Sequence, residues 1–333
     1  MIPLAAFRAA AETIRGIADA TPLVPSPFHS AQVGQEVLLK LETAQPIGAF
    51  KLRGALNAVS ALPDETPGVA CCSTGNHGRG VAYAARSRGL RAVICMSELV
   101  PQAKFDGIRA LGAEVRIIGR SQDEAQQEVL ALCRNEGLAE ISPFDDPEVI
   151  AGQGTIGLEL MSARPDLELI LVPLSGGGLA AGIAAAVKAL KPSVRVIGVT
   201  MERGAAMAAS IRAGHPVEVA EVASLADSLG GGIGLQNRFS YPMCRALLDD
   251  AVLVSEEEIR DAMQALYFED RMVAEGASVT GLAALASGKV RARGPVATVV
   301  TGRNLDMGLH ARIMAGKDVM LGDYSLKGRT YAA

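Results

Sequence analysis

The strongest constraint on the fold is a regular alternation of short apolar runs and longer amphipathic segments between residues 68 and 136. Short apolar runs bounded by turn residues are typical of buried strands, whereas the segments between them have helical periodicity. The expected strands and helices alternate in the order 68–72, 78–89, 92–96, 102–111, 114–118 and 122–136. Because such alternation is typical of βαβ units, the sequence predicts an α/β fold with a parallel sheet.

A second alternating block surrounds the first. Its expected elements are helices at 50–62, 149–163 and 180–190 and strands at 37–41, 169–173 and 194–199. Residues 143–147, which are rich in Pro and Asp, separate the two blocks. We therefore expect two domains with parallel-sheet cores flanked by helices. Residues 1–69 and 146–333 would form a large domain, and residues 70–145 an inserted small domain.

Charge and hydropathy narrow the class of partner. The net charge is -4, the pI is about 5.7 and the basic residues are scattered, so no patch for nucleic acid or for an anionic membrane is visible. No apolar run approaches the roughly 20 residues of a membrane span. The alanine-rich segment 3–20 carries Glu12 and Asp19, which favours an ordinary amphipathic helix over a targeting peptide. We expect a cytoplasmic protein that binds small molecules and other copies of itself.

Cysteine and histidine are sparse and lack metal-ligand spacing. None of the five cysteines forms a Cys-x-x-Cys pair, and Cys71, Cys72 and Cys95 fall in expected buried strands. We interpret these thiols as core residues. The four histidines show no paired spacing, so we expect no metal site.

Lys51 is the first candidate for chemistry. It follows the expected strand at 37–41 and a turn at 45–48, so it lies where a helix begins after a strand has ended. In a partly desolvated cleft the pKa of an ammonium falls, and the neutral amine can form an imine with an aldehyde cofactor. Taken alone, an exposed lysine at a helix start is the commoner explanation.

A glycine-rich turn joins the expected strand at 169–173 to the helix that follows. Its members are Ser175, Gly176, Gly177, Gly178 and Leu179. Glycines let the backbone turn its N–H groups inward, and a helix N-terminus adds the positive end of its dipole, so the turn can hold one phosphate group. A turn that serves only close packing is equally compatible with this sequence.

A third stretch, residues 72–80, again links a strand to a helix. Its hydroxyl residues, glycines and backbone N–H groups could hold a carboxylate, and Asn76 could donate a hydrogen bond to a phenolic oxygen. A plain capped helix is the simpler alternative. His77 could act as a general base or could brace the loop.

With these stretches in place, the chain resembles the fold type II pyridoxal-phosphate enzymes, in the threonine/serine dehydratase branch that includes serine racemase. The matched motifs are the lysine motif at 49–55, the substrate-carboxylate loop at 73–78, the phosphate loop at 175–179 and the pyridine-nitrogen motif at 301–304. Their order and spacing also match, from about Thr21 to Gly316. The resemblance implies a two-domain architecture like that of the tryptophan synthase β subunit, and a homodimer.

Within that branch, three further runs look most like the hydroxyectoine-utilization dehydratases. They lie at 144–147, 201–207 and 225–234. The implied substrate is a β-hydroxy amino acid, and its side chain is left open. Threonine, serine, a hydroxyaspartate-like acid and a hydroxylated diamino acid from hydroxyectoine breakdown all remain candidates.

The resemblance implies a role for each matched residue. Lys51 would hold pyridoxal phosphate as an imine and, once freed by the substrate amine, would remove the α-proton. The implied cofactor contacts are Lys51, Phe50, Asn76, Ser175, Gly176, Gly177, Gly178, Leu179, Glu275 and Thr301. The implied substrate contacts are Ser73, Thr74, Gly75, Asn76 and His77, with Thr74 also a catalytic candidate.

The implied reaction is dehydration and deamination of the amino acid to a 2-oxo acid and ammonia. A neutral hydroxyl such as that of Thr301 does not keep the pyridine nitrogen protonated as a carboxylate would, so the cofactor is a weaker electron sink. Prompt loss of a β-hydroxyl then fits better than transamination. A racemase or a β-replacement enzyme of the same fold is the alternative.

Three positions depart from the family pattern. Thr74 stands where serine racemase-like enzymes have the serine that acts on the second face. Thr200 stands where the related cation site begins with a glutamate, and a neutral hydroxyl is a poor ligand for a hard cation, although Glu202 is close. Arg303 stands where many relatives have glycine, and it either pairs with a second acidic group on the substrate or lies at the surface.

Two readings from other classes compete with this one. The alternating pattern could belong to a nicotinamide oxidoreductase, but the sequence lacks G-x-G-x-x-G with an acidic residue about 20 positions on. A noncatalytic protein that binds a phosphate ligand is the other alternative. It gives no reason for Lys51 to matter.

Overall fold

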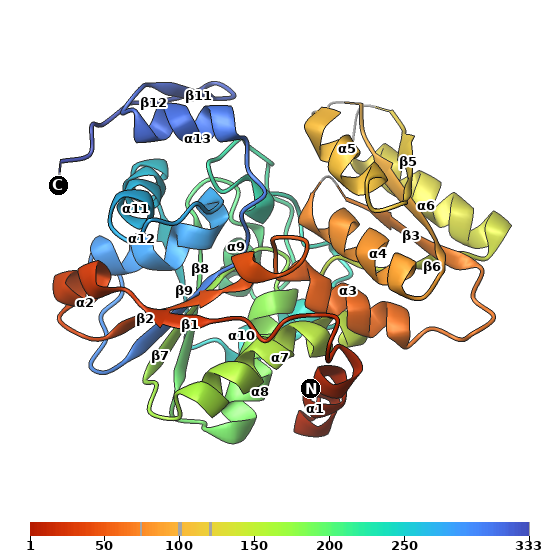
Figure 1. Cartoon of the computed structure of the whole chain (residues 1–333), viewed down its shortest axis with the longest axis horizontal. Coiled ribbons are helices and arrows are strands. Elements are labelled where there is room, and N and C mark those ends of the chain that lie inside the picture. Colours follow the sequence, from red (N-terminus) through yellow and green to blue (C-terminus); the bar gives the residue numbers. More distant parts are fainter. Residues whose placement is uncertain (74, 99–101, 120–121, 333) are drawn as a thin grey trace.

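Six strands form the larger of two parallel sheets in the computed structural model, which describes residues 1–73, 75–98, 102–119 and 122–332 (Figure 1). Its strands in spatial order are β1 (Leu23–Pro25), β2 (Val37–Leu41), β10 (Val296–Val300), β7 (Leu169–Pro173), β8 (Arg195–Met201) and β9 (Asp250–Val254). Every neighbouring pair is parallel except β1 with β2. The α/β fold predicted from the sequence is therefore confirmed.

The smaller sheet has four parallel strands and lies beside the larger one (Figure 1). Its order is β5 (Glu114–Ile117), β4 (Arg91–Met96), β3 (Gly68–Cys72) and β6 (Ala139–Glu140). The first three strands agree with the sequence prediction to within a residue at each end, whereas β6 was not predicted. How the chain divides into domains stays a prediction.

Helices cover both faces of each sheet (Figure 1). Those packed with the larger sheet and its edges are α1 (Leu4–Thr13), α2 (Pro27–Val33), α7 (Pro147–Ala163), α8 (Gly178–Leu190), α9 (Ala206–Ala213), α10 (Ser240–Leu247), α11 (Glu256–Phe268), α12 (Thr280–Ala286) and α13 (Met307–Met314). Those of the smaller sheet are α3 (Lys51–Ser60), α4 (Asn76–Ser87), α5 (Gln102–Arg109) and α6 (Gln122–Glu136). Short 3₁₀ turns, η1 (Glu42–Ala44), η2 (Asp227–Leu229) and η3 (Gly276–Val279), and a hairpin of β11 (Val319–Leu321) and β12 (Tyr324–Leu326) complete the chain.

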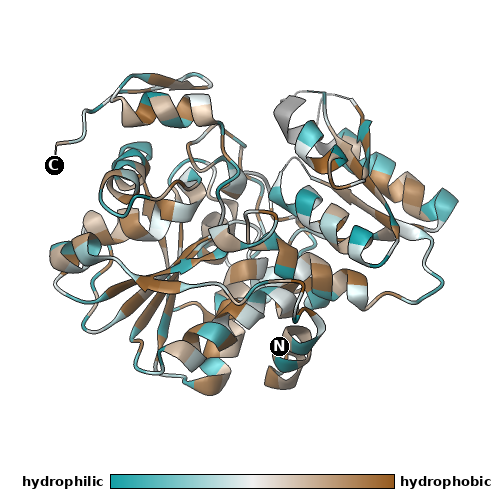
Figure 2. Ribbon diagram, viewed as in Figure 1, coloured by the Kyte–Doolittle hydropathy of each residue, from teal (hydrophilic) through white to brown (hydrophobic). Residues whose placement is uncertain are grey.

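The core has apolar residues on both faces of the larger sheet (Figure 2). Along β7, Ile170 and Val172 face one cluster, with α7 and α8, while Leu169 and Leu171 face the other, with α11 and α12. All four side chains are fully buried. A strand buried on both faces has a continuous apolar run without polar alternation, which explains why this strand was evident in the sequence.

A buried ionic network fixes helix α3 against the larger sheet. The Arg53 guanidinium donates to both carboxylate oxygens of Glu42, at 2.8 and 2.9 Å, and to Glu159 at 2.5 Å. Glu159 also accepts a hydrogen bond from Lys40 on β2. Burial alone would raise the pKa of Glu42, but the adjacent guanidinium holds that pKa below its ordinary value. The network therefore sets the position of the helix that begins at Lys51.

Removing Arg53 should destabilise the protein strongly. Arg53→Met leaves the fully buried Glu42 carboxylate without its cation, and we expect a loss of about 3–5 kcal/mol in the free energy of unfolding, measured by urea denaturation. Arg15→Met is the matched control because Arg15 pairs with Glu12 at the surface, where an ion pair contributes about 0–1 kcal/mol. Equal unfolding midpoints for the two variants would contradict the prediction.

Candidate active site

Four segments from distant parts of the sequence follow the carboxyl ends of parallel strands. Residues 175–178 follow β7, residues 301–304 follow β10, residues 73–78 follow β3, and Lys51 comes after β2 and a connecting turn. In open α/β sheets ligands bind at this edge. The Phe50 N–H donates to the carbonyl of Thr301 at 3.0 Å, and the Arg303 N–H donates to the carbonyl of Gly48 at 3.0 Å. These bonds hold the start of α3 against the end of β10.

Lys51 is partly buried at the first position of α3. Its Nζ donates to the carbonyl oxygen of Pro143 at 2.6 Å and lies 5.3 Å from the centre of the Phe50 ring. Burial lowers the pKa of this ammonium from its ordinary value to about 8, and only the nearby Cys71 opposes the shift. A substantial fraction of the amine is therefore neutral near pH 8, as a nucleophilic lysine requires.

Asn76, Glu275 and Asn304 form a hydrogen-bonded triad. The Asn76 amide donates to both Glu275 oxygens, at 2.9 and 3.1 Å, and its own oxygen accepts a hydrogen bond from the Asn304 amide at 2.7 Å. Glu275 also accepts from the Asn304 N–H at 2.8 Å and from the Ser228 hydroxyl at 3.2 Å. Burial raises the pKa of Glu275, while these donors lower it. The triad fixes which face of the Asn76 amide carries its N–H groups.

Thr301 is buried in the site, with 5% of its surface exposed, and its hydroxyl contacts an uncharged side chain. Its hydroxyl is 3.0 Å from the hydroxyl of Ser278, and the Ser278 oxygen also accepts the N–H of Gly302 at 2.8 Å. The Ser278 hydroxyl is 2.9 Å from the Gly302 carbonyl as well. Two hydroxyls, one from the residue after β10 and one from η3, therefore lie together here, and the role of Thr301 stays a prediction.

The glycine turn has the geometry of an anion cradle. Gly177 has φ of 90° and is the N-cap of α8, and no side chain caps that helix end. A Cβ on Gly176 would lie 2.2 Å from the Phe144 ring, and one on Gly177 would lie 2.6 Å from Cε of Met207, so only glycine fits at both positions. Uncapped backbone N–H groups at a helix start suit a phosphate.

The loop at residues 73–78 is organised around Ser73. The Ser73 Oγ accepts the N–H groups of Gly75 and Gly78 at 3.3 and 3.0 Å, so its own proton is free to point elsewhere. His77 is buried, and its Nε2 lies 2.8 Å from the carbonyl oxygen of Ile141, to which it donates. Burial and the charge of Lys51 lower the pKa of His77 to about 3, so the ring is neutral near pH 7. Thr74 lies outside the described residues.

The three departures from the family pattern have different surroundings. Arg303 is exposed, and its Cγ and Nε lie beside Gly48, each 3.2 Å from the position of a Cβ there. Thr200 is buried with its hydroxyl 3.5 Å from the sulfur of Met201, and Glu202 pairs with Lys289 at 3.1 Å. Within residues 1–73, 75–98, 102–119 and 122–332 no cluster of three His, Cys, Asp or Glu side chains is arranged to hold a metal ion.

Several residues of the site were not assigned a role from the sequence. These are Ser278, Asn304, Ser228, Pro143, Phe144 and Asp145. Asn304, Phe144, Asp145 and Ser228 lie in stretches that the sequence had singled out, so proximity to a motif was an available signal. Ser278 lies in none of these stretches, and its role is defined by Thr301, 23 positions away.

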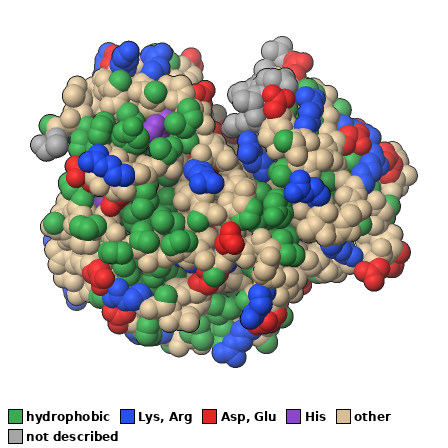
Figure 3. Space-filling view, in the orientation of Figure 1, with side chains coloured by type: hydrophobic (Ala, Val, Ile, Leu, Met, Phe, Trp, Pro, Cys, Tyr) green, Lys and Arg blue, Asp and Glu red, His purple; other side chains and the backbone are tan. Residues whose placement is uncertain are grey.

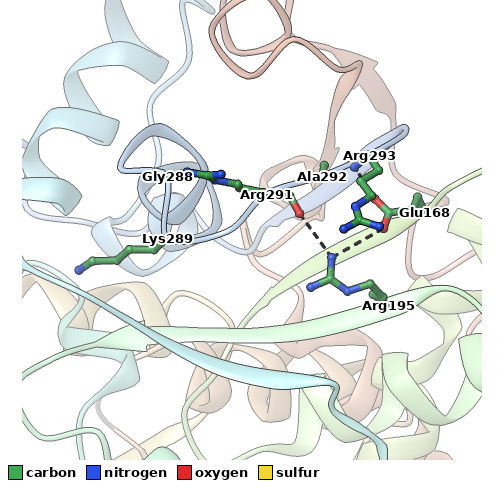
Figure 4. Close-up of a pocket in the computed structure, with 7 residues that line it drawn as sticks. All are labelled: Glu168, Arg195, Gly288, Lys289, Arg291, Ala292 and Arg293. Carbon is green, nitrogen blue, oxygen red and sulfur yellow. Dashed lines mark hydrogen bonds and ion pairs between the residues drawn. The ribbon is translucent and has the colours of Figure 1, made fainter.

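A surface pocket lies at the opposite edge of the larger sheet (Figure 4). Its lining residues include Glu168, which immediately precedes β7, and Arg195, which begins β8. The others come from the segment before β10 and are Gly288, Lys289, Arg291, Ala292 and Arg293. The Arg195 guanidinium lies 3.7 Å from Glu168 and 3.4 Å from the carbonyl of Arg291. None of the candidate site residues lines this pocket.

Charged and apolar side chains are distributed as follows over the surface and the helices. The face in Figure 3 carries interspersed basic and acidic side chains with apolar ones between them. Among the described residues, no helix combines the length and the apolar character needed to span a bilayer.

Comparison with known proteins identifies the relatives of this chain. The family of pyridoxal-phosphate dependent enzymes matches residues 14–302. A candidate threonine dehydratase of Sinorhizobium fredii is 56% identical, over 95% of this chain and 96% of its own, and the L-threonine ammonia-lyase of Thermotoga maritima is 39% identical over 94% and 78%. The structure of maize serine racemase superimposes with a TM-score of 0.89 at 31% identity, covering 94% of this chain and 97% of that one.

The lowered pKa of Lys51 can be measured directly. We expect reductive methylation of Lys51, followed by peptide mass spectrometry across a pH series, to reach half its maximal rate near pH 8. A free lysine derivative treated alongside should reach half its maximal rate near its ordinary pKa of about 10.4. A profile for Lys51 that coincides with that of the free amine would contradict the prediction.

Proposed function

Because the chain belongs to the pyridoxal-phosphate dependent enzyme family, we propose that it is a threonine ammonia-lyase, which converts L-threonine to 2-oxobutanoate and ammonia. The coarser activity, pyridoxal-phosphate dependent elimination of the β-hydroxyl of an amino acid, follows from its relatives. The observation that carries the proposal is similarity to threonine ammonia-lyases along nearly the whole chain.

The residues at the candidate site fit pyridoxal phosphate. The uncapped start of α8 with Gly176, Gly177 and Gly178 would hold its phosphate, with Ser175 and Leu179 at the ends of the turn. Asn76, which the bond to Glu275 orients, would contact its ring oxygen, and Thr301 would face its pyridine nitrogen. Phe50 and Glu275 would lie near the ring, and Lys51 would hold the aldehyde carbon. We expect no bound metal to be needed for this set of contacts.

When bound, pyridoxal phosphate supplies an aldehyde that condenses with amines and a ring that withdraws electrons from the substrate α-carbon. Lys51 would accept the α-proton of the substrate on Nζ. Its pKa near 8 keeps part of the amine unprotonated at physiological pH, and burial keeps it close to the reacting carbon. The neutral hydroxyl of Thr301 limits the electron withdrawal, which favours prompt loss of the β-hydroxyl.

The loop at residues 73–78 would hold the substrate carboxylate. The Ser73 hydroxyl accepts two backbone N–H groups, so its own proton is available to a carboxylate oxygen. Thr74, Gly75 and Asn76 would complete this pocket. The neutral ring of His77 would orient the loop through the Ile141 carbonyl without exchanging a proton near pH 7.

The atoms of the proposed reaction balance. Loss of the α-proton and the β-hydroxyl releases one water and leaves an enamine. The enamine takes up one water and gives a 2-oxo acid and ammonia. A racemase returns the proton to the other face of the same carbon and releases neither product. The similarity to maize serine racemase makes racemization the second candidate.

The test is product analysis with the purified protein. We expect ammonia and a 2-oxo acid in equal amounts from L-threonine. L-serine and 3-hydroxyaspartate are tested as alternative substrates, and we expect L-threonine to have the highest kcat/KM. Lys51→Ala should lower kcat by at least about 100-fold, since general acid–base catalysis contributes 10²–10⁴-fold. Lys317→Ala, at an exposed position, is the control. Inversion of L-serine without release of ammonia would replace this proposal with the racemase.

The wider context of the enzyme is also proposed. Cys71, Cys95, Cys133 and Cys244 are free thiols, which favours a reducing compartment, and we propose the cytoplasm. We also propose a homodimer, to be checked by light scattering of the purified chain. A role in hydroxyectoine breakdown, suggested by the sequence runs at 144–147, 201–207 and 225–234, stays a prediction. It requires activity on a hydroxylated diamino acid that exceeds the activity on threonine.

A further inference from the structure

Asp145 accepts hydrogen bonds from the start of a helix that is far from it in the sequence. Its Oδ2 accepts the N–H of Arg238, and its Oδ1 accepts the N–H groups of Phe239 and Ser240, all at 2.8 Å. Ser240 is the first residue of α10, and its N-cap Phe239 provides no side-chain cap. A carboxylate at a helix N-terminus is favoured by the helix dipole and by hydrogen bonds to otherwise unpaired donors. Asp145 therefore fixes the first turn of α10.

That first turn in turn supports the glycine turn. The Ser240 hydroxyl donates to the carbonyl of Gly176 at 2.6 Å, and the Cys244 thiol lies 3.4 Å from the carbonyl of Gly177. The Asn237 amide donates to the Ser240 hydroxyl at 2.8 Å and so helps to orient it. The Gly176 carbonyl is thus held toward α10, whereas the Gly177 carbonyl also accepts the N–H of Ala181 at 2.8 Å within α8. Since the carbonyl and N–H groups of a planar peptide point in opposite directions, this arrangement turns the N–H of the following residue away from α10.

The neighbours of Asp145 approach the same site from the other direction. The Phe144 ring packs so closely on Gly176 that a Cβ there would lie 2.2 Å from it, and a Cβ on Gly178 would lie 2.7 Å from the Phe144 carbonyl oxygen. The Pro143 carbonyl accepts the hydrogen bond from Lys51. A single segment, residues 143–145, thus contacts the lysine, the glycine turn and α10.

We propose that Asp145 is a positioning residue for the cofactor phosphate, an inference that rests on the function proposed above. Asp145 holds Ser240, Ser240 holds the carbonyl of Gly176, and the glycine turn is thereby fixed with its N–H groups toward the phosphate. Asp145 itself does not touch the cofactor. Its loss should weaken binding of the phosphate group specifically and leave the reaction of Lys51 with an aldehyde intact.

The experiment compares two ligands that differ only in the phosphate. Dissociation constants for pyridoxal phosphate and for pyridoxal are measured by absorbance with the cofactor-free full-length protein. For Asp145→Ala we expect affinity for pyridoxal phosphate to fall about tenfold, the effect of losing one well-placed hydrogen bond to a charged group. We expect affinity for pyridoxal to stay within about twofold. Asp145→Asn, which keeps one acceptor oxygen, should fall between Asp145→Ala and the natural protein.

Asp146 provides the matched control. It is the adjacent aspartate, and it caps α7 by accepting the N–H groups of Glu148 and Val149 at 2.8 and 2.9 Å. Asp146→Ala should therefore lower thermal stability as Asp145→Ala does, without changing the ratio of the two affinities. Ser240→Ala should lower the affinity for pyridoxal phosphate relative to that for pyridoxal. The double variant with Asp145→Ala should lose less than the sum of the two separate effects.

The outcomes separate this inference from the proposed function. If the natural protein binds pyridoxal phosphate no better than pyridoxal, the cofactor assignment of the glycine turn fails. If the natural protein prefers pyridoxal phosphate but both Asp145 variants retain that preference, the inference about Asp145 fails alone. Equal weakening of both ligands, or the same result for Asp146→Ala, would show a general structural effect and would also overturn it.

Discussion

The site depends on the backbone bonds that join the start of α3 to the end of β10. Phe50 donates to the carbonyl of Thr301, Arg303 donates to that of Gly48, and Ala49 and Gly302 form an isolated bridge between them. These bonds fix the position of Lys51, at the start of α3, relative to Thr301, at the end of β10. The two elements extend from adjacent strands of the larger sheet, because β2, which precedes α3 in the chain, pairs with β10.

Burial of the site residues shifts their pKa values and so decides which of them can exchange a proton near neutral pH. Desolvation lowers the pKa of Lys51 to about 8 and that of His77 to about 3, and it raises the pKa of Glu275. The Glu275 oxygens accept hydrogen bonds from the Asn76 side-chain amide, the Asn304 backbone N–H and the Ser228 hydroxyl. Lys51 therefore titrates close to physiological pH, whereas His77 stays neutral there. A single basic amine in a site of fixed amides and hydroxyls is suited to the removal of one proton from one carbon.

Local sequence patterns predicted most of the elements that carry the site, because these elements have strong local signals. The buried strands at 37–41, 68–72 and 169–173 are continuous apolar runs, and the glycines at 176–178 mark the turn that follows the last of them. The first helix ends at Thr13, well before the expected limit of residue 20. Strand β6, with two residues, is too short for any periodicity, so pairing with β3 alone defines it.

The contacts that organise the site could not be predicted in the same way, because they join residues with no local relation. Asn76 and Glu275 are 199 positions apart, and Asp145 and Ser240 are 95 apart. In the sequence only Asp146 has a local signal, because Pro147 follows it as at the start of a helix, whereas nothing near Asp145 indicates its partner. The fold separates them, because the Asp146 carboxylate caps its own helix while the Asp145 carboxylate meets the start of α10. Their different roles therefore arise from the packing of α10 against α8, which brings Ser240 to the glycine turn and leaves one aspartate within its reach.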